Sequence, residues 1–154
     1  MKTLLITLLF SLNALAIELT FTGPCSEEFI MRAQVEEEFE NVGELTASTL
    51  TKFGIPFLGS AEGIASVFGT PVGNAAMEII SPTEMRAYGW CFAVDGVAPD
   101  LYSHEVVITR ETKKITWTFG FAHFKDGQWI TQCTPAYKIK PASMCEDPTS
   151  EVSL

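Results

Sequence analysis

The chain lacks the short motifs that usually mark redox, metal or phosphate sites. It has four cysteines but no Cys-x-x-Cys pair, and its two histidines, His104 and His123, are far from i, i+4 spacing. These absences argue against a thioredoxin-like redox site and against a zinc site. There is also no G-x-G-x-x-G or Gly-Lys-Ser/Thr loop to hold a nucleotide phosphate. We therefore predict no cofactor and no metal ion.

Basic residues are scarce. Ten lysines and arginines stand against nineteen aspartates and glutamates, for a formal net charge of −9. A surface this acidic repels phosphate backbones and anionic lipid head groups. The balance excludes nucleic acid as a partner but identifies no positive partner.

Long apolar runs are missing except at the start. Residues 1–16 combine Lys2, a mostly apolar stretch at 4–12 and the small-x-small sequence Ala14-Leu15-Ala16. This pattern is typical of a secretory signal peptide, and its apolar run is too short for a stable membrane span. A buried N-terminal helix is the alternative. We expect cleavage after Ala16 and an exported protein, periplasmic or extracellular, with no membrane insertion after signal cleavage.

The rest of the chain reads as one domain, residues 17–145, followed by a flexible polar tail at 146–154. Four cysteines in an exported chain predict two disulfides, for which three connectivities are open. We favour Cys25–Cys133 and Cys91–Cys145.

Two strands and a helix are expected in the first half. Ile17–Thr22 and Phe29–Val35 alternate apolar and polar residues, which predicts a neighbouring pair of strands. From Val42 to Phe53 the apolar spacing becomes helical, with Asn41 and Glu44 arranged like a capping box. Gly54 and Pro56 then end the helix.

A glycine-rich stretch, residues 55–74, follows the helix. Within it, residues 63–69 predict either a short strand or a helical turn, and Met77–Ile80 is another short apolar run. We expect no phosphate to bind there.

Strands dominate the second half. Trp90–Val94 predicts a strand with Trp90, Phe92 and Val94 on one face, ended by an Asp95-Gly96 type I′ turn. Glu105–Thr109 predicts a short strand and Ile115–Phe124 a long aromatic one.

A second Asp-Gly turn at 125–128 returns the chain to a strand at Trp129–Thr131. A two-residue loop places Phe124 opposite Trp129 and Gly120 opposite Cys133. The fold class is therefore α+β, a β-grasp-like mixed sheet with one main amphipathic helix at about 42–53 and an extra C-terminal aromatic hairpin.

Two features of this region could carry chemistry. Cys91 could be the nucleophile of a thiol enzyme or hydrolase with His104 or His123 as base, but it lies in mid-strand, where nothing lowers its pKa. The aromatic stripe Trp117, Phe119, Phe121, Phe124 and Trp129 could line a ligand surface. We interpret the stripe as core packing, with Trp129 as the exception.

Four segments in order resemble a secreted domain family of unknown function related to the C-terminal β-domain of transcobalamin. The segments are Val42-Gly43-Glu44-Leu45-Thr46, Gly63-Ile64-Ala65-Ser66-Val67-Phe68-Gly69, Gly89-Trp90-Cys91-Phe92-Ala93-Val94-Asp95-Gly96 and Ile115-Thr116-Trp117-Thr118-Phe119. The resemblance covers roughly residues 17–121 and implies a β-grasp fold of the soluble-ligand-binding kind.

The chain departs from the family pattern at Thr112-Lys113-Lys114, in its hairpin after Phe121 and in its four cysteines. Transcobalamin holds its corrinoid mainly with a second, helical domain, which this chain lacks, so cobalamin binding is a minor alternative. We predict a non-enzymatic ligand-binding or protein-interaction module. A small structural or inhibitory envelope protein is a further alternative. The expected binding residues are Gly63, Gly69, Trp90, Asp95, Gly96 and Trp129.

Overall fold

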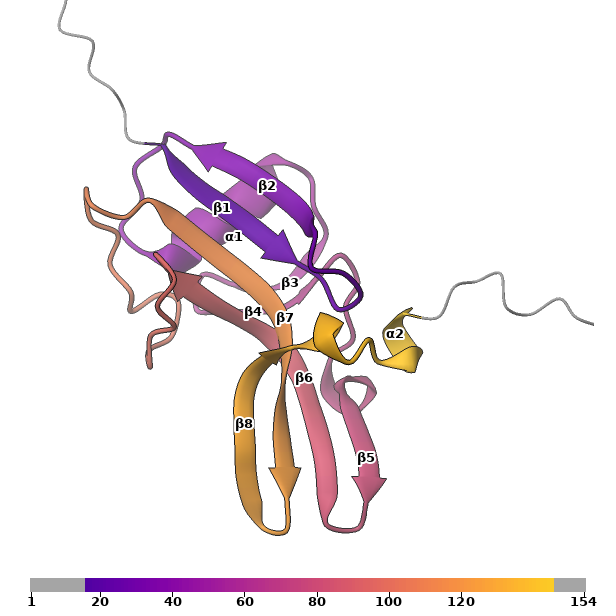
Figure 1. The fold of residues 1–154 in the computed structure, drawn as a ribbon. Coiled ribbons are helices and arrows are strands. Elements are labelled where there is room, and N and C mark those ends of the chain that lie inside the picture. The colour runs from indigo at the N-terminus through magenta and orange to yellow at the C-terminus, as the bar shows by residue number, and fades with distance from the viewer. Residues whose placement is uncertain (1–15, 146–154) are drawn as a thin grey trace, which may run out of the picture.

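The computed structural model describes residues 16–145, so the predicted signal peptide, apart from its last residue, and the predicted tail at 146–154 lie outside the described residues. The described chain is a strand-rich α+β structure with one main helix (Figure 1). Its elements, where η denotes a 3-10 helix, are β1 (Ile17–Thr22), β2 (Phe29–Val35), α1 (Val42–Lys52), β3 (Phe57–Ser60), β4 (Gly63–Val67), η1 (Gly73–Ala76), β5 (Met77–Ser81), β6 (Glu84–Val94), β7 (Lys114–Lys125), β8 (Gln128–Pro135), η2 (Ala136–Lys138) and α2 (Ala142–Cys145).

Strand β7 organises the main sheet, whose order is β2-β1-β7-β6-β5 with β8 also paired to β7. One edge of β7 pairs with β6 along almost its whole length. The other edge pairs first with β1, in parallel, over residues 114–118, and then with β8, antiparallel, over residues 120–125. The sheet therefore has two halves that share β6 and β7. We call them the body, which contains β1, β2 and α1, and the arm, formed by β5, β8 and the adjoining parts of β6 and β7 (Figure 1).

The body has the larger hydrophobic core. Helix α1 covers one face of the sheet, and its Leu45 and Leu50 are fully buried in one cluster with Phe21 and Ile115. The Asn41 side chain accepts a 2.9 Å hydrogen bond from the amide of Glu44, which caps the helix as predicted. Gly54 follows the helix with φ of 65°, a conformation that glycine adopts without steric cost.

Two disulfides are present, as predicted, but the favoured pairing was wrong. Cys25 is bonded to Cys145, and Cys91 is bonded to Cys133. Cys25 lies in the loop between β1 and β2, so its bond ties the C-terminal helix α2 to the start of the domain. Chain topology decides this pairing, because sequence spacing does not show which loops meet.

Cys133 reaches Cys91 by passing over β7 at Gly120. A Cβ on Gly120 would lie 3.0 Å from the carbonyl oxygen of Thr134 and 3.4 Å from the Cα of Cys133. The absence of a side chain at Gly120 lets β8 fold onto the face of β7, and the Cα atoms of the two cysteines come within 5.9 Å.

The same bend corrects the predicted register of the hairpin. Phe124 is opposite Trp129 as expected, but Gly120 is opposite Pro135 rather than Cys133. The pairing of β7 with β8 has two irregularities, and at each of them β8 contains one residue more than β7. Cys133, which lies within one of them, has φ of 53°.

Other strand predictions were partly wrong. Glu105–Thr109 is not a strand, because this segment forms a turn and a loop with only one isolated bridge, from Val107 to Asn41. The first part of the 63–69 segment is β4, which pairs with β3, a strand that was not predicted. Strand β6 begins at Glu84, well before the predicted start at Trp90.

Candidate functional site

The arm is a thin sheet with an apolar face and a polar face, and the strand register assigns residues to each. Directly opposed residues share a face, and faces alternate along a strand. One cross-strand row is Ile79–Met85–Phe124–Trp129, and the next is Met77–Ala87–Ala122. We call these seven residues the apolar face. The opposite, polar face carries the rows Glu78–Arg86–His123–Thr131 and Ser81–Glu84–Lys125–Gln128.

The apolar face is open to solvent at both edges of the arm. Ile79 on β5 is 67% exposed and Trp129 on β8 is 49% exposed. Between them, Phe124 packs against Trp129 edge to face, with ring centroids 5.3 Å apart. None of the residues in the row Ile79–Met85–Phe124–Trp129 belongs to either hydrophobic cluster of the described chain. Exposed apolar rows of this kind mark interaction surfaces.

A shallow pocket of about 360 Å³ lies where the arm meets the body. Met77 and Ala87 line it from the arm, and β4 together with residues 71–73 supplies the other wall. Trp90 also lines the pocket, and its ring is held by a 2.9 Å hydrogen bond from Nε1 to the Thr70 hydroxyl. The full lining is Ile64, Ala65, Pro71, Val72, Gly73, Ala76, Met77, Ala87, Tyr88, Gly89 and Trp90.

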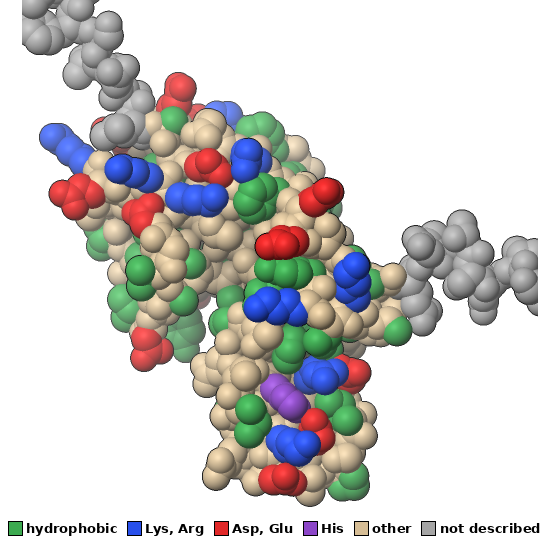
Figure 2. Space-filling view, in the orientation of Figure 1, with side chains coloured by type: hydrophobic (Ala, Val, Ile, Leu, Met, Phe, Trp, Pro, Cys, Tyr) green, Lys and Arg blue, Asp and Glu red, His purple; other side chains and the backbone are tan. Residues whose placement is uncertain are grey.

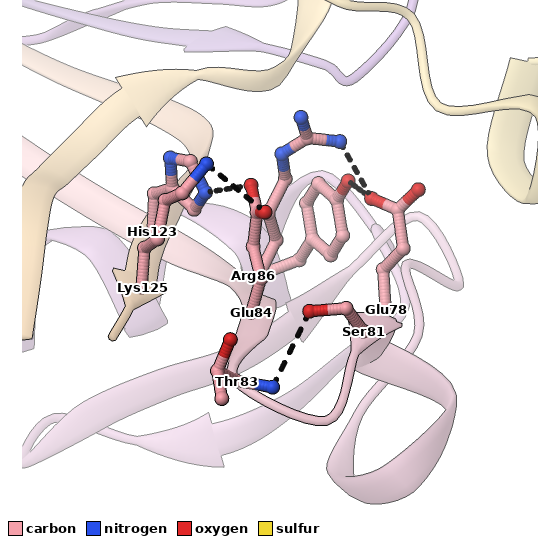
Figure 3. Close-up of polar contacts among 8 residues, drawn as sticks. Glu78, Ser81, Thr83, Glu84, Arg86, His123 and Lys125 are labelled. Carbon is pink, nitrogen blue, oxygen red and sulfur yellow. Dashed lines mark hydrogen bonds and ion pairs between the residues drawn. The ribbon is translucent and has the colours of Figure 1, made fainter. Parts of the chain in front are cut away.

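The polar face is held together by two carboxylates (Figure 3). Glu78 accepts hydrogen bonds from the Tyr88 hydroxyl, at 2.6 Å, and from the Arg86 guanidinium, at 3.0 Å. Glu84 bridges to His123 Nε2 at 2.9 Å and to the Lys125 ammonium at 3.3 Å. These contacts connect β5, β6 and β7 and stiffen the arm behind its apolar face.

The protonation states agree with a structural role for this network. The hydrogen bond from Tyr88 and the nearby Arg86 lower the pKa of Glu78, and the contacts with His123 and Lys125 lower the pKa of Glu84. Burial, followed by the hydrogen bond to Glu78, raises the pKa of Tyr88 to about 12. At neutral pH both carboxylates are ionised and paired, and the phenol is protonated.

Cys91 and His123 lie on opposite faces of the sheet. Cys91 is opposite Thr118 and shares a face with Ala122, so the side chain of His123 points away from it. The sulfur of Cys91 is also bonded to Cys133. The other histidine, His104, lies in the loop after β6, stacked on Tyr102 at a centroid distance of 6.0 Å.

The expected binding residues fall in three separate places. Trp90 lines the pocket. Gly63 directly precedes the lining residues Ile64 and Ala65, and Gly69 lies just before the lining residues 71–73. Trp129 lies on the arm, opposite Phe124 and in the same row as Met85 near the start of β6.

Asp95 and Gly96 form the two-residue turn beyond the other end of β6. Their φ angles are 49° and 83°, and Asp95 Oδ1 accepts hydrogen bonds from the amides of Lys113, at 3.1 Å, and Lys114, at 2.9 Å. About ten residues of strand separate this turn from Met85, roughly 33 Å. Asp95 therefore fixes the start of β7 and does not share a site with Trp129.

Sequence reasoning missed five members of the apolar face as binding residues: Met77, Ile79, Met85, Ala87 and Ala122. The sequence contains part of the evidence for strands in this region. Met77–Ile80 is a mostly apolar run, and residues 84–88 alternate polar and apolar side chains. Which edge and which face those strands occupy depends on their pairing, and the sequence alone does not show it.

Within residues 16–145, no three His, Cys, Asp or Glu side chains converge as a metal site would require. In the same part of the chain, no helix has the length and hydropathy needed to cross a membrane. Comparison of the chain with protein-family models, with curated proteins and with solved structures finds no match.

Proposed function

We propose that this chain is an exported, non-enzymatic protein-interaction module of the β-grasp type, which binds an extended apolar segment of a partner protein on the arm. The observation that carries the proposal is the apolar row Ile79–Met85–Phe124–Trp129 on a stiffened sheet, exposed at both ends and half-buried in the middle. Its two disulfides support export, because such bonds persist in oxidising compartments.

The strand order supports the β-grasp assignment. An N-terminal hairpin, β1–β2, is followed by α1, and β1 then pairs in parallel with β7, which lies next to β6. The resulting order, β2-β1-β7-β6 with a helix across one face, is the arrangement expected of that fold. The resemblance to the transcobalamin β-domain remains a prediction that rests on the sequence motifs.

The size of the apolar face favours an extended segment over a folded partner. Four strands about 4.8 Å apart and two cross-strand rows give an area on the order of 200 Å². A stable contact between two folded proteins buries about 800 Å² on each partner. An extended segment needs less area, because its own backbone can add hydrogen bonds to those of the sheet.

The arm is also prepared for binding by its rigidity. The disulfide between Cys91 and Cys133 fastens β8 to β6, and the Glu78 and Glu84 networks fasten β5, β6 and β7 on the reverse side. A preorganised surface loses little conformational entropy when a partner binds. Most of the apolar contact energy is then retained as affinity.

Selection from a displayed library of random twelve-residue peptides tests the proposal. We expect enrichment of peptides with apolar residues at alternate positions, and Ile79→Ala, at the more exposed end of the row, should weaken their binding at least tenfold. Tyr102→Ala is the matched control, because Tyr102 is 71% exposed but lies in the loop after β6, away from the arm. Failure to enrich peptides, or equal binding by Ile79→Ala, would contradict the proposal.

A further inference from the structure

Strand β5 has a free outer edge. It is the terminal strand in the sheet order, and among the described residues it pairs with β6 alone. The row on the apolar face therefore ends at Ile79, whose side chain is more exposed than that of Trp129 at the opposite end. From this arrangement, and resting on the proposed function, we infer that the partner segment binds as an added strand along the outer edge of β5.

The other edges of the main sheet carry more protective features than β5. Strand β8 has two register irregularities and ends at Pro135, and both features hinder pairing with a further strand. Strand β2 carries Arg32, held 3.4 Å from Glu18, and leads into the acidic run at 36–38. Strand β5 has a single irregularity, which comes after Ile79, and its register with β6 is regular from Met77 to Ile79. It contains neither proline nor lysine.

The side-chain pattern of β5 specifies the chemistry of the added strand. Met77 and Ile79 point to the apolar face, so every second residue of the added strand must be apolar to extend the row. The intervening residues lie beside Glu78, whose side chain is 45% exposed. Arg86 and Tyr88 both donate to its Oε2, so among the described residues Oε1 keeps room for a further donor. Basic residues at these positions would pair with Glu78 on a chain whose net charge is −9.

Charge also favours such a segment, rather than a second copy of the chain, as the occupant of the β5 edge. Two copies joined through β5 would bring together two chains of net charge −9, which repel each other. A segment that alternates apolar and basic residues meets both the apolar row and the carboxylate. The occupant we assign is therefore an extended segment of this type from another exported protein.

The test uses the full mature chain and a synthetic heptapeptide, Lys-Val-Lys-Val-Lys-Val-Lys, with a non-alternating peptide of the same composition as control. We expect the alternating peptide to bind at least tenfold more tightly and to slow amide hydrogen exchange within residues 77–81. A peptide with Glu in place of Lys should bind at least tenfold more weakly than the alternating Lys peptide.

Two variants distinguish the added strand from binding on the face alone. Ile80 lies at the register irregularity of β5, where proline is tolerated better than elsewhere in a strand. Ile80→Pro should weaken binding at least tenfold, while Ile80→Ala, which removes the side chain but keeps the amide, should change it less than threefold. If Ile80→Pro does not fold, amide exchange of the wild-type chain decides the question.

The outcomes are separable. Binding that is weakened by Trp129→Ala, without protection of the β5 amides, would overturn the added strand and leave the proposed function intact. Dimerisation through β5 without peptide, detected by sedimentation equilibrium and abolished by Ile80→Pro, would also overturn it. Peptide selection that yields no ligand for the arm would overturn both.

Discussion

Gly120 of β7 lies directly beneath Cys133 of β8, and a Cβ added to Gly120 would lie 3.4 Å from the Cα of Cys133. This close approach lets β8 cross the face of β7, so that Cys133 can bond with Cys91 on β6. The arm is therefore fastened across three strands at its junction with the body. Figure 2 shows how the arm projects from the body below this junction.

Substitution of Gly120 by alanine should destabilise the protein. The new methyl group would meet backbone atoms of Thr134 and Cys133 at 3.0–3.4 Å, and the disulfide limits how far β8 can move away. We expect a loss of about 1–3 kcal/mol in the free energy of unfolding, measured by urea denaturation. Gly89→Ala is the matched control, because Gly89 lies directly opposite on β6 and a methyl group there would meet no atom within 4 Å. Equal effects of the two substitutions would show that the close approach is unimportant.

Each disulfide should stabilise a different part of the molecule. In the chain-entropy account, closing loops of 42 and 120 residues stabilises the fold by about 4 and about 5 kcal/mol, as upper values. The double variant Cys91→Ser/Cys133→Ser should speed amide exchange in β8 most. Cys25→Ser/Cys145→Ser should instead affect the loop between β1 and β2. Hydrogen exchange with peptide-level resolution measures both patterns, and identical patterns would refute this division.

Alkaline titration should reveal Tyr88 as the last tyrosine to ionise. Its pKa in the folded state is about 12, against an ordinary value of 10.0. Because folding raises the pKa of Tyr88, its protonated phenol stabilises the folded state. This contribution is fully present below pH 10 and is lost as the pH rises towards 12. The phenolate absorbance should show one late step among the three tyrosines, and Tyr88→Phe should remove it. A late step that persists in Tyr88→Phe would disprove the assignment.

The buried hydrogen bond between Trp117 and Thr46 should contribute measurably to stability in a double-mutant cycle. Trp117 Nε1 donates to the Thr46 hydroxyl at 3.0 Å, and both side chains are buried. Thr46→Val keeps the shape but leaves the indole without this acceptor, so we expect a loss of about 1–3 kcal/mol. In a Trp117→Phe background the same substitution should cost much less, because no indole remains. Equal costs in both backgrounds would mean that the bond contributes nothing.

Local sequence signals predicted much of the body correctly. The alternation in Ile17–Thr22 and Phe29–Val35, and the Asn41 cap with Gly54 after the helix, all depend on residues close together in the chain. The prediction of a strand at Glu105–Thr109 was wrong. The apolar residues of this segment give it a strand-like pattern, but it is a loop held to the body by long-range hydrogen bonds, such as that from the amide of Ile108 to the carbonyl of Glu40.

The candidate site was predicted only in fragments. Trp129 was expected to be exposed, and it lies at one end of the apolar face. The partners of Trp129 in the row lie on β5, β6 and β7, and Met85 is far from it in the chain. Asp95 and Gly96, which were also expected to be binding residues, form a turn at the far end of β6.

The sequence by itself determined the α+β class, the main helix, the long aromatic strand and the presence of two disulfides, because periodicity, capping residues and cysteine count are local or compositional properties. Only the tertiary structure decided which cysteines pair, how β8 passes over Gly120, and that Ile79, Met85, Phe124 and Trp129 form one row with exposed ends. These features depend on which strand edges meet, and that is set by the packing of the whole sheet against its core.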